Sequence, residues 1–172
     1  MLHESDKVKE LKITESSVTF EDFYSKDYFP KELEGAIKKA NMLILPYEGF
    51  RDFEKPVFPE ETQKFFHFLR EKGDPSLITD ICISDEDYFE LELHADLIVI
   101  PMMILSSFVL PVTINVVSDY ISSKIESRNR NTELKVKATF TVVNGDSSKI
   151  FEFEGDADKF EETFEPVKDL FK

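Results

Sequence analysis

The chain has 172 residues and a formal net charge of −14 at pH 7, with 35 Asp and Glu against 21 Lys and Arg. Its length is typical of one domain, and a hydrophobic content of 41% excludes global disorder. The acidic balance argues against direct nucleic-acid binding, because Lys and Arg must neutralise the phosphates, and a single cysteine excludes an intrachain disulfide.

Residues 1–29 are interpreted as an N-terminal arm. They mix charges throughout, which predicts no secretory signal and a cytoplasmic location. Residues 18–23 alternate weakly and are compatible with a short edge strand. The arm interleaves acidic and aromatic side chains, so its rings either pack on the domain or bind a partner. The candidate partner-binding residues of the arm are Phe23, Tyr24, Tyr28 and Phe29.

Residues 30–100 are predicted to form an α/β half with the order helix, strand, helix, strand. Pro30 suits the first turn of an amphipathic helix, and residues 42–45 form an apolar run typical of a strand buried on both faces. A second helix, with its buried face at residues 65–69, is stopped by Gly73 and Pro75. Residues 77–83 then read as a second strand. This order predicts a small parallel or mixed sheet with helices packed on it.

The densest acidic cluster, Asp85, Glu86 and Asp87, precedes residues 88–94, whose alternation is typical of a half-exposed strand. A divalent cation accepts carboxylate ligands, but the spacing is not that of an EF-hand loop. A solvated loop with an acidic strand face is the interpretation we favour. These three acids are also included among the candidate partner-binding residues. A metal-dependent enzyme that uses residues 85–96 is the alternative.

Other catalytic chemistry has little support. Cys82 lies within an Ile-Cys-Ile run, which is typical of a small buried side chain, and the three histidines are far apart in the sequence. The chain has no phosphate-binding glycine motif and no nucleophile elbow. We therefore expect no enzymatic activity, no metal site and no cofactor.

Residues 97–117 contain no charged side chain and are long enough to span a bilayer. Pro101 and Pro111 interrupt this segment, and several polar side chains lie within it. We therefore predict a buried strand at residues 97–100 and a helix at residues 108–125. Insertion of residues 97–117 into a membrane stays open as the alternative.

The predicted helix at residues 108–125 has a broad apolar stripe, formed by Leu110, Ile114, Val117, Ile121 and Ile125. Such a stripe indicates a long buried helix. Its polar side chains gather near the end, so the last turns are expected to meet solvent or a partner. Tyr120 widens the apolar side of this helix and is included among the candidate partner-binding residues.

The C-terminal part predicts a β-hairpin followed by a helix. Residues 134–142 alternate between apolar and basic or hydroxylated side chains, Asn144 and Gly145 form a turn signal, and residues 150–154 supply the returning strand. Asp156 is placed to cap a final helix that Pro166 kinks. Residues 101–172 thus form a third part, and we expect one compact domain of the α+β or α/β class.

From residue 59 onward the predicted elements follow a recognisable order. An acidic-start helix, a strand, a long uncharged helix, a hairpin and a final helix succeed one another. The first helix, the hairpin and the final helix have the sequences PEETQKFFHFLREKG, TELKVKATFTVVNGDSSKIFEFEG and DADKFEETFEPV. This order resembles that of the small effector-associated component domains of bacterial conflict and defence systems. The resemblance covers roughly 110 residues and rests on element order. It implies a non-catalytic adaptor that couples a sensor or protease to an effector, and it carries over no active-site residue.

The function that these observations favour is protein–protein interaction. We expect an accessory or adaptor subunit of a bacterial multi-protein system, whose partner is another protein or a second copy of the chain. The first alternative is an acidic inhibitor that mimics nucleic acid and occupies a basic groove on another protein. The second is a small membrane-associated effector that inserts residues 97–117.

Overall fold

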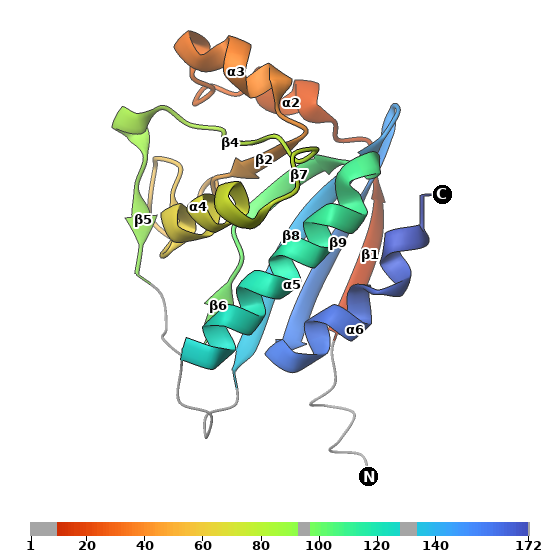
Figure 1. Ribbon diagram of the computed structural model, residues 1–172. Coiled ribbons are helices and arrows are strands. Elements are labelled where there is room, and N and C mark those ends of the chain that lie inside the picture. The colour runs from red at the N-terminus through yellow and green to blue at the C-terminus, as the bar shows by residue number, and fades with distance from the viewer. Residues whose placement is uncertain (1–9, 93–96, 128–133, 172) are drawn as a thin grey trace.

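The computed structural model describes residues 10–92, 97–127 and 134–171. A seven-stranded mixed sheet forms the centre, in the order β1-β9-β8-β7-β2-β4, with β6 also paired to β8. Figure 1 shows α4, α5 and α6 on one face of this sheet. The predicted α/β organisation, with a long buried helix and a C-terminal hairpin followed by a helix, is therefore confirmed. The sheet strands are β1 Glu10–Ser16, β2 Met42–Leu45, β4 Thr79–Ile81, β6 Leu97–Val99, β7 Met102–Ser106, β8 Lys135–Asn144 and β9 Ser147–Asp156.

A second, two-stranded parallel sheet pairs β3 with β5. The α-helices are α2 Phe20–Tyr24, α3 Glu34–Lys39, α4 Thr62–Lys72, α5 Leu110–Ser127 and α6 Phe160–Phe164. The short strands are β3 Phe58–Pro59 and β5 Glu90–Leu91, and the 3₁₀ turns are η1 Lys31–Leu33, η2 Asp85–Asp87, η3 Ser107–Val109, η4 Ala157–Lys159 and η5 Pro166–Asp169. The expected half-exposed strand at residues 88–94 is thus reduced to two residues outside the main sheet, and residues 93–94 lie outside the described part.

The two faces of the sheet carry separate cores because successive side chains of a strand point to opposite faces. On β2, Met42 and Ile44 pack with the main core under α4, α5 and α6. Leu43 and Leu45 pack with a smaller core that includes Ile37 of α3. A strand that is buried on both faces explains the uninterrupted apolar run at residues 42–45.

The uncharged segment at residues 97–117 is divided among β6, β7, η3 and the first turns of α5. Val99 pairs with Lys137 of β8, whereas Met103 pairs with Phe140, so the β6–β7 side has one residue more than β8. This extra residue is a bulge at Pro101, where the missing N–H removes no ladder bond. No helix in the described part of the chain combines the length and the apolar character that a membrane crossing requires.

The N-terminal segment departs from expectation. Residues 18–23 do not form an edge strand; instead β1 covers Glu10–Ser16 and residues 20–24 form α2. β1 pairs antiparallel with β9 along its whole length. The sequence of β1 has no clear period-two pattern, because β1 is an edge strand in which Ile13 is exposed and no face is cleanly apolar.

The C-terminal hairpin is confirmed, with two local corrections. The two loop residues are Gly145 and Asp146, because Asn144 still pairs with Ser147, and Gly145 has φ of 69°. Glycine at the first loop position is the preference of a type II′ turn. Asp156 stands at the N-cap of η4 but does not cap it with its side chain, which instead accepts a hydrogen bond from Lys135 at 3.0 Å.

Candidate functional site

The aromatic residues of the arm pack against the domain. Phe29 is buried, and Phe23, Tyr24 and Tyr28 are half-buried against the smaller core under α2 and α3. Tyr24 makes an edge contact with Phe29, with the ring centroids 5.7 Å apart. Burial raises the pKa of Tyr28 well above its usual value, and the neighbouring Glu48 carboxylate adds to the shift. These rings therefore contribute mainly to folding, and Phe29 offers no surface to a partner.

Tyr120 is also a core residue. Its ring lies edge-on to Phe65 and to Phe68 of α4, with centroid distances of 4.9 and 5.4 Å. The polar turns of α5 do begin near this position, but Tyr120 points to the opposite side, toward α4. Its assignment to a partner-binding surface is incompatible with its burial.

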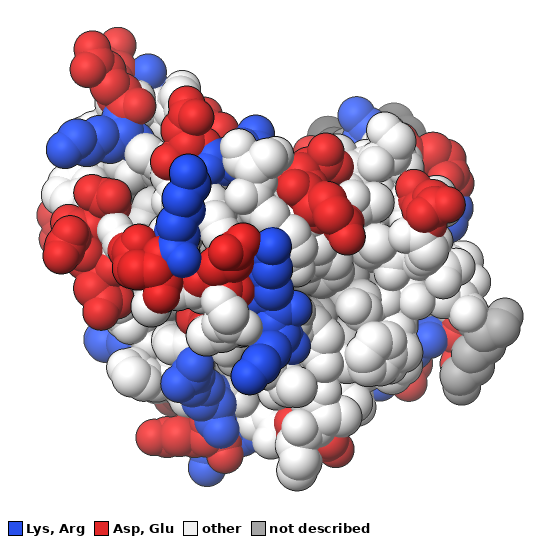
Figure 2. Space-filling model, turned by 90° about the horizontal axis from the view of Figure 1, so that it is seen from above, with Lys and Arg blue, Asp and Glu red and all other residues white. Residues whose placement is uncertain are grey.

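The acidic residues Asp85, Glu86 and Asp87 form η2, and all three are exposed. The Ser84 hydroxyl donates a hydrogen bond to Asp87 at 3.0 Å and holds the start of this turn. Residues 73–123 contain no Lys or Arg at all. The charges of Asp85, Glu86 and Asp87 are therefore not neutralised by neighbours in sequence. Figure 2 shows many acidic side chains on one face of the molecule, with Lys and Arg side chains among them.

Two exposed phenylalanines stand beside this turn. Phe89 is 50% exposed and Phe53 is 38% exposed, and their ring centroids lie 6.1 Å apart. Phe89 is placed by β5, whose pairing with β3 is extended by a hydrogen bond from the Phe58 N–H to the Phe89 carbonyl. On the neighbouring residues of the same two strands, Phe58 stacks on Tyr88 with the ring centroids 4.8 Å apart.

We name this region the acidic aromatic surface and define it by Phe53, Phe89, Asp85, Glu86 and Asp87. The sequence identified the three acids but not the two rings. Phe53 lies in a loop rich in turn residues, and the alternation at residues 88–94 predicts that Phe89 belongs to a half-exposed strand. Their pairing depends on the contact between two segments 36 positions apart, which no local pattern shows.

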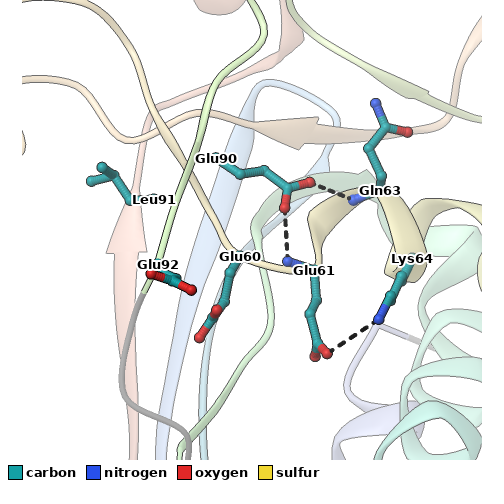
Figure 3. Close-up of a pocket in the computed structure, with 7 residues that line it drawn as sticks. All are labelled: Glu60, Glu61, Gln63, Lys64, Glu90, Leu91 and Glu92. Carbon is teal, nitrogen blue, oxygen red and sulfur yellow. Dashed lines mark hydrogen bonds and ion pairs between the residues drawn. The ribbon is translucent and has the colours of Figure 1, made fainter.

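A pocket of about 490 Å³ lies on the other side of β5. Figure 3 shows Glu90 pointing from β5 to the N-terminus of α4, where its carboxylate accepts hydrogen bonds from the N–H groups of Glu61 at 2.9 Å and Gln63 at 3.1 Å. This carboxylate takes the place of a local N-cap side chain, and its negative charge interacts favourably with the positive end of the helix dipole. The pocket is lined by Glu60, Glu61, Gln63, Lys64, Glu90, Leu91 and Glu92.

Tyr88 completes this arrangement by donating a hydrogen bond from its hydroxyl to Glu90 at 2.5 Å. Burial raises the pKa of Tyr88 well above its usual value, and its hydrogen bond to Glu90 raises it further. The hydrogen bonds of Glu90 thus give this carboxylate a structural role. Among the other lining carboxylates, Glu61 is paired with Lys124 at 2.7 Å and with Lys64 at 3.7 Å.

Metal binding and thiol chemistry have no support in the part of the chain that the structure describes. Among residues 10–92, 97–127 and 134–171, no group of three His, Cys, Asp or Glu side chains is placed to hold a metal ion. Cys82 is buried in the smaller core, and its burial raises the thiol pKa to about 12, with a further contribution from Asp80. A thiol with that pKa is not a nucleophile at neutral pH.

Comparison with known proteins gives no relative: no family model, no curated protein and no solved structure matches this chain.

Proposed function

We propose that the protein is a non-catalytic interaction module that binds a basic, partly apolar segment of a partner protein through the acidic aromatic surface. The observation that carries the proposal is the exposed Phe53–Phe89 pair beside three exposed carboxylates. Exposed aromatic side chains are typical binding hot spots, because they bury a large area with little loss of conformational entropy.

The charge of the surface selects the partner. Asp85, Glu86 and Asp87 lie in a stretch without cations, so they attract Arg and Lys and steer their approach. An Arg side chain is the best complement, because its guanidinium group stacks on an aromatic face and also pairs with carboxylates. The chain already contains such a contact, in which the Arg51 guanidinium lies 4.9 Å from the Phe50 ring centre.

The test uses a fluorescently labelled peptide of alternating Arg and Leu, with the same peptide carrying Glu in place of Arg as the negative probe. Fluorescence anisotropy should report binding of the Arg peptide alone, and the affinity should fall as salt is raised. Phe53→Ala combined with Phe89→Ala should weaken binding by about tenfold or more. Asp85→Asn, Glu86→Gln and Asp87→Asn together should remove most of the salt dependence.

The matched control is Ile13→Ala, which removes a comparably exposed apolar side chain from the edge strand β1. It should leave the affinity unchanged, and circular dichroism should confirm that every variant is folded. Equal binding of the Glu peptide, or full affinity in the double phenylalanine variant, would contradict the proposal. Self-association through the same surface, detected by sedimentation, would point to a second copy of the chain as the partner.

The wider role that we propose is that of an accessory or adaptor subunit of a bacterial multi-protein system, active in the cytoplasm. This part is supported by the order of elements from residue 59 onward and by the absence of a catalytic constellation among the described residues. An acidic inhibitor that occupies a nucleic-acid-binding groove is the second candidate, favoured by the cation-free stretch at residues 73–123. That candidate predicts binding to a folded basic domain, which double-stranded DNA displaces, and no binding to the Arg-Leu peptide.

A further inference from the structure

The main sheet ends at β1, whose outer edge offers backbone hydrogen-bonding groups. β1 is seven residues long and pairs with β9 alone, whereas β4, at the opposite edge, has only three residues. Figure 1 shows β1 at one side of the sheet, beside β9. Among the residues that the structure describes, no backbone–backbone hydrogen bond reaches β1 from any other element. Because alternate residues of an antiparallel strand direct their N–H and C=O groups away from the paired neighbour, this edge can accept another strand.

β1 lacks the features that usually protect an edge strand. Its register with β9 runs along its whole length without a bulge, and it contains no proline. Its charged side chains are matched within the same molecule, because Lys12 lies opposite Glu152 on β9 and Glu15 forms an ion pair with Lys149. These charges are therefore poorly placed to repel a further strand.

Ile13 is the exposed apolar side chain of this edge, and it lies at the midpoint of β1. It is 46% exposed, although the residue opposite it on β9, Phe151, is fully buried in the main core. Leu11, on the same face of β1, packs against that core. The apolar face of the sheet therefore continues to the edge, where Ile13 is only half covered.

We infer that β1 pairs antiparallel with the β1 strand of a second copy of the chain, about a two-fold axis at Ile13. In this register Ile13 lies opposite Ile13 of the second copy, Lys12 opposite Thr14, and Leu11 opposite Glu15. All of residues 10–16 then pair, and no charged side chain lies opposite a like charge. The sheet becomes continuous through the two copies, and the interface is isologous.

The sequence of β1 favours this register over its neighbours. Directly opposite residues point to the same face of a sheet, so a two-fold axis perpendicular to the sheet permits only shifts that keep each side chain on its face. The nearest shift in one direction places Lys12 opposite Lys12 and limits the overlap to residues 10–14. The nearest shift in the other direction places Ile13 opposite Glu15 and limits the overlap to residues 12–16.

The charge of the edge favours a second copy over a strongly basic or acidic segment of another protein. Residues 11–19 contain one Lys and one Glu, so this part of the chain is neutral although the whole chain has a net charge of −14. The general repulsion between two acidic molecules opposes association, and salt screens it. Dimerisation should therefore strengthen as salt is added, whereas peptide binding at the acidic aromatic surface should weaken. The inference does not depend on the proposed function.

Sedimentation equilibrium of the full chain tests the pairing. A dimer should form with a dissociation constant on the order of 10–100 µM, because a single strand pair is a small interface. Ile13→Lys places two ammonium groups opposite each other and should weaken the dimer by about tenfold or more. Ile78→Lys is the matched control, because Ile78 is 49% exposed and lies just before β4 at the other edge, and it should leave the dimer intact. Circular dichroism should show that both variants are folded.

Cysteine cross-linking tests the register in a Cys82→Ala background. Directly opposite residues have Cα atoms about 4.5–5.5 Å apart, within the range that a disulfide bridges, so Ile13→Cys should give a disulfide-linked dimer on mild oxidation. Lys12→Cys lies diagonal to its copy and should not link to itself. An equimolar mixture of the Lys12→Cys and Thr14→Cys chains should link, because these two positions lie opposite each other.

Several outcomes would overturn the inference. A monomer at all concentrations, or a dimer that Ile13→Lys leaves intact, would show that β1 is not a self-association edge. Dissociation by Ile78→Lys would move the interface to β4, and equal cross-linking of Lys12→Cys and Ile13→Cys would reject the pairing. Phe53→Ala with Phe89→Ala should leave the dimer intact. Loss of the Arg-Leu peptide binding described above, with the dimer retained, would contradict the proposed function alone.

Discussion

Lys124 donates a hydrogen bond to the Glu61 carboxylate at 2.7 Å, across 63 positions of sequence, and so joins the last turns of α5 to the N-terminus of α4. Glu61 has a positive φ of 68°, which is uncommon for a residue other than glycine. Its backbone N–H is held by Glu90 and its side chain by Lys124. The surrounding contacts thus maintain a backbone conformation that glutamate alone would not favour.

Replacement of Lys124 by Met tests the value of this link. The Lys124 side chain is only 15% exposed, so its ion pair is less screened than a surface pair, and we expect a loss of about 1 kcal/mol of stability. For a domain of this size that lowers Tm by about 2–4 °C. Lys64→Met is the control, because Lys64 lies 3.7 Å from the same carboxylate but is 74% exposed. Equal shifts of Tm in the two variants would contradict the prediction.

Glu90→Gln addresses the other contact of the same helix terminus. The carboxylate accepts three hydrogen bonds, from two N–H groups and the Tyr88 hydroxyl, and an amide retains only one acceptor oxygen. Urea unfolding should show a loss of about 1–2 kcal/mol. Glu92→Gln, in the same pocket but exposed, should have no measurable effect. If the free energy of unfolding of the Glu90→Gln variant equals that of the unchanged protein, the carboxylate does not cap α4.

Much of the fold could be predicted from sequence because many of its strands and helices have a recognisable local pattern. The buried strand at residues 42–45, the long helix of the uncharged segment and the C-terminal hairpin each follow from a local pattern. The sequence does not predict strand β7, because it lies within a continuous apolar run that has no period to separate a strand from a helix. The bulge at Pro101 is what separates β6 from β7.

The candidate site was predicted only in part. Asp85, Glu86 and Asp87 are visible as a cluster in the sequence, whereas the Phe53–Phe89 pair is formed by tertiary contact. Tyr120 and Phe29 are candidate partner-binding residues in the sequence, yet both are buried in the structure. Burial depends on which helix lies opposite, and here α4 and the α2–α3 segment supply the covering side chains.

The tyrosines predict a loss of stability at alkaline pH. Burial raises the pKa of Tyr24, Tyr28, Tyr47 and Tyr88 in the folded state, and in unfolded chains the value is about 10. Above pH 10 the unfolded state therefore releases protons that the folded state retains, so the free energy of unfolding falls as pH rises. Absorbance at 295 nm should stay low until circular dichroism reports unfolding. Ionisation of all of these tyrosines near pH 10 in folded protein would contradict this.

Cys82 provides a probe of global unfolding. Its side chain is buried in the smaller core, and burial raises the pKa of the thiol to about 12, so the thiolate is scarce at pH 8. The native protein should react with a thiol reagent such as DTNB at the rate of unfolding, and immediately in concentrated urea. Cys82→Ala should keep the fold and abolish the reaction. Fast stoichiometric labelling of the native protein would show that the core under α2 and α3 opens locally.

Two glycines in helical surroundings are expected to respond to alanine in opposite directions. Gly35 lies within α3, and an added Cβ would meet nothing within 4 Å, so Gly35→Ala should raise stability by about 0.5–1 kcal/mol through helix propensity. Gly73 ends α4, and there a Cβ would clash with the backbone carbonyl of Leu69, the acceptor of the Gly73 N–H.

Gly73→Ala must therefore shift the end of α4 and weaken that hydrogen bond, at a cost of about 1 kcal/mol or more. Urea unfolding of the two variants, measured with the same buffer and probe, gives both signs in one experiment. A stabilised Gly73→Ala protein would show that the C-terminus of α4 can relax without loss of its contacts, and a destabilised Gly35→Ala protein would mean that α3 is held by features other than its helical propensity.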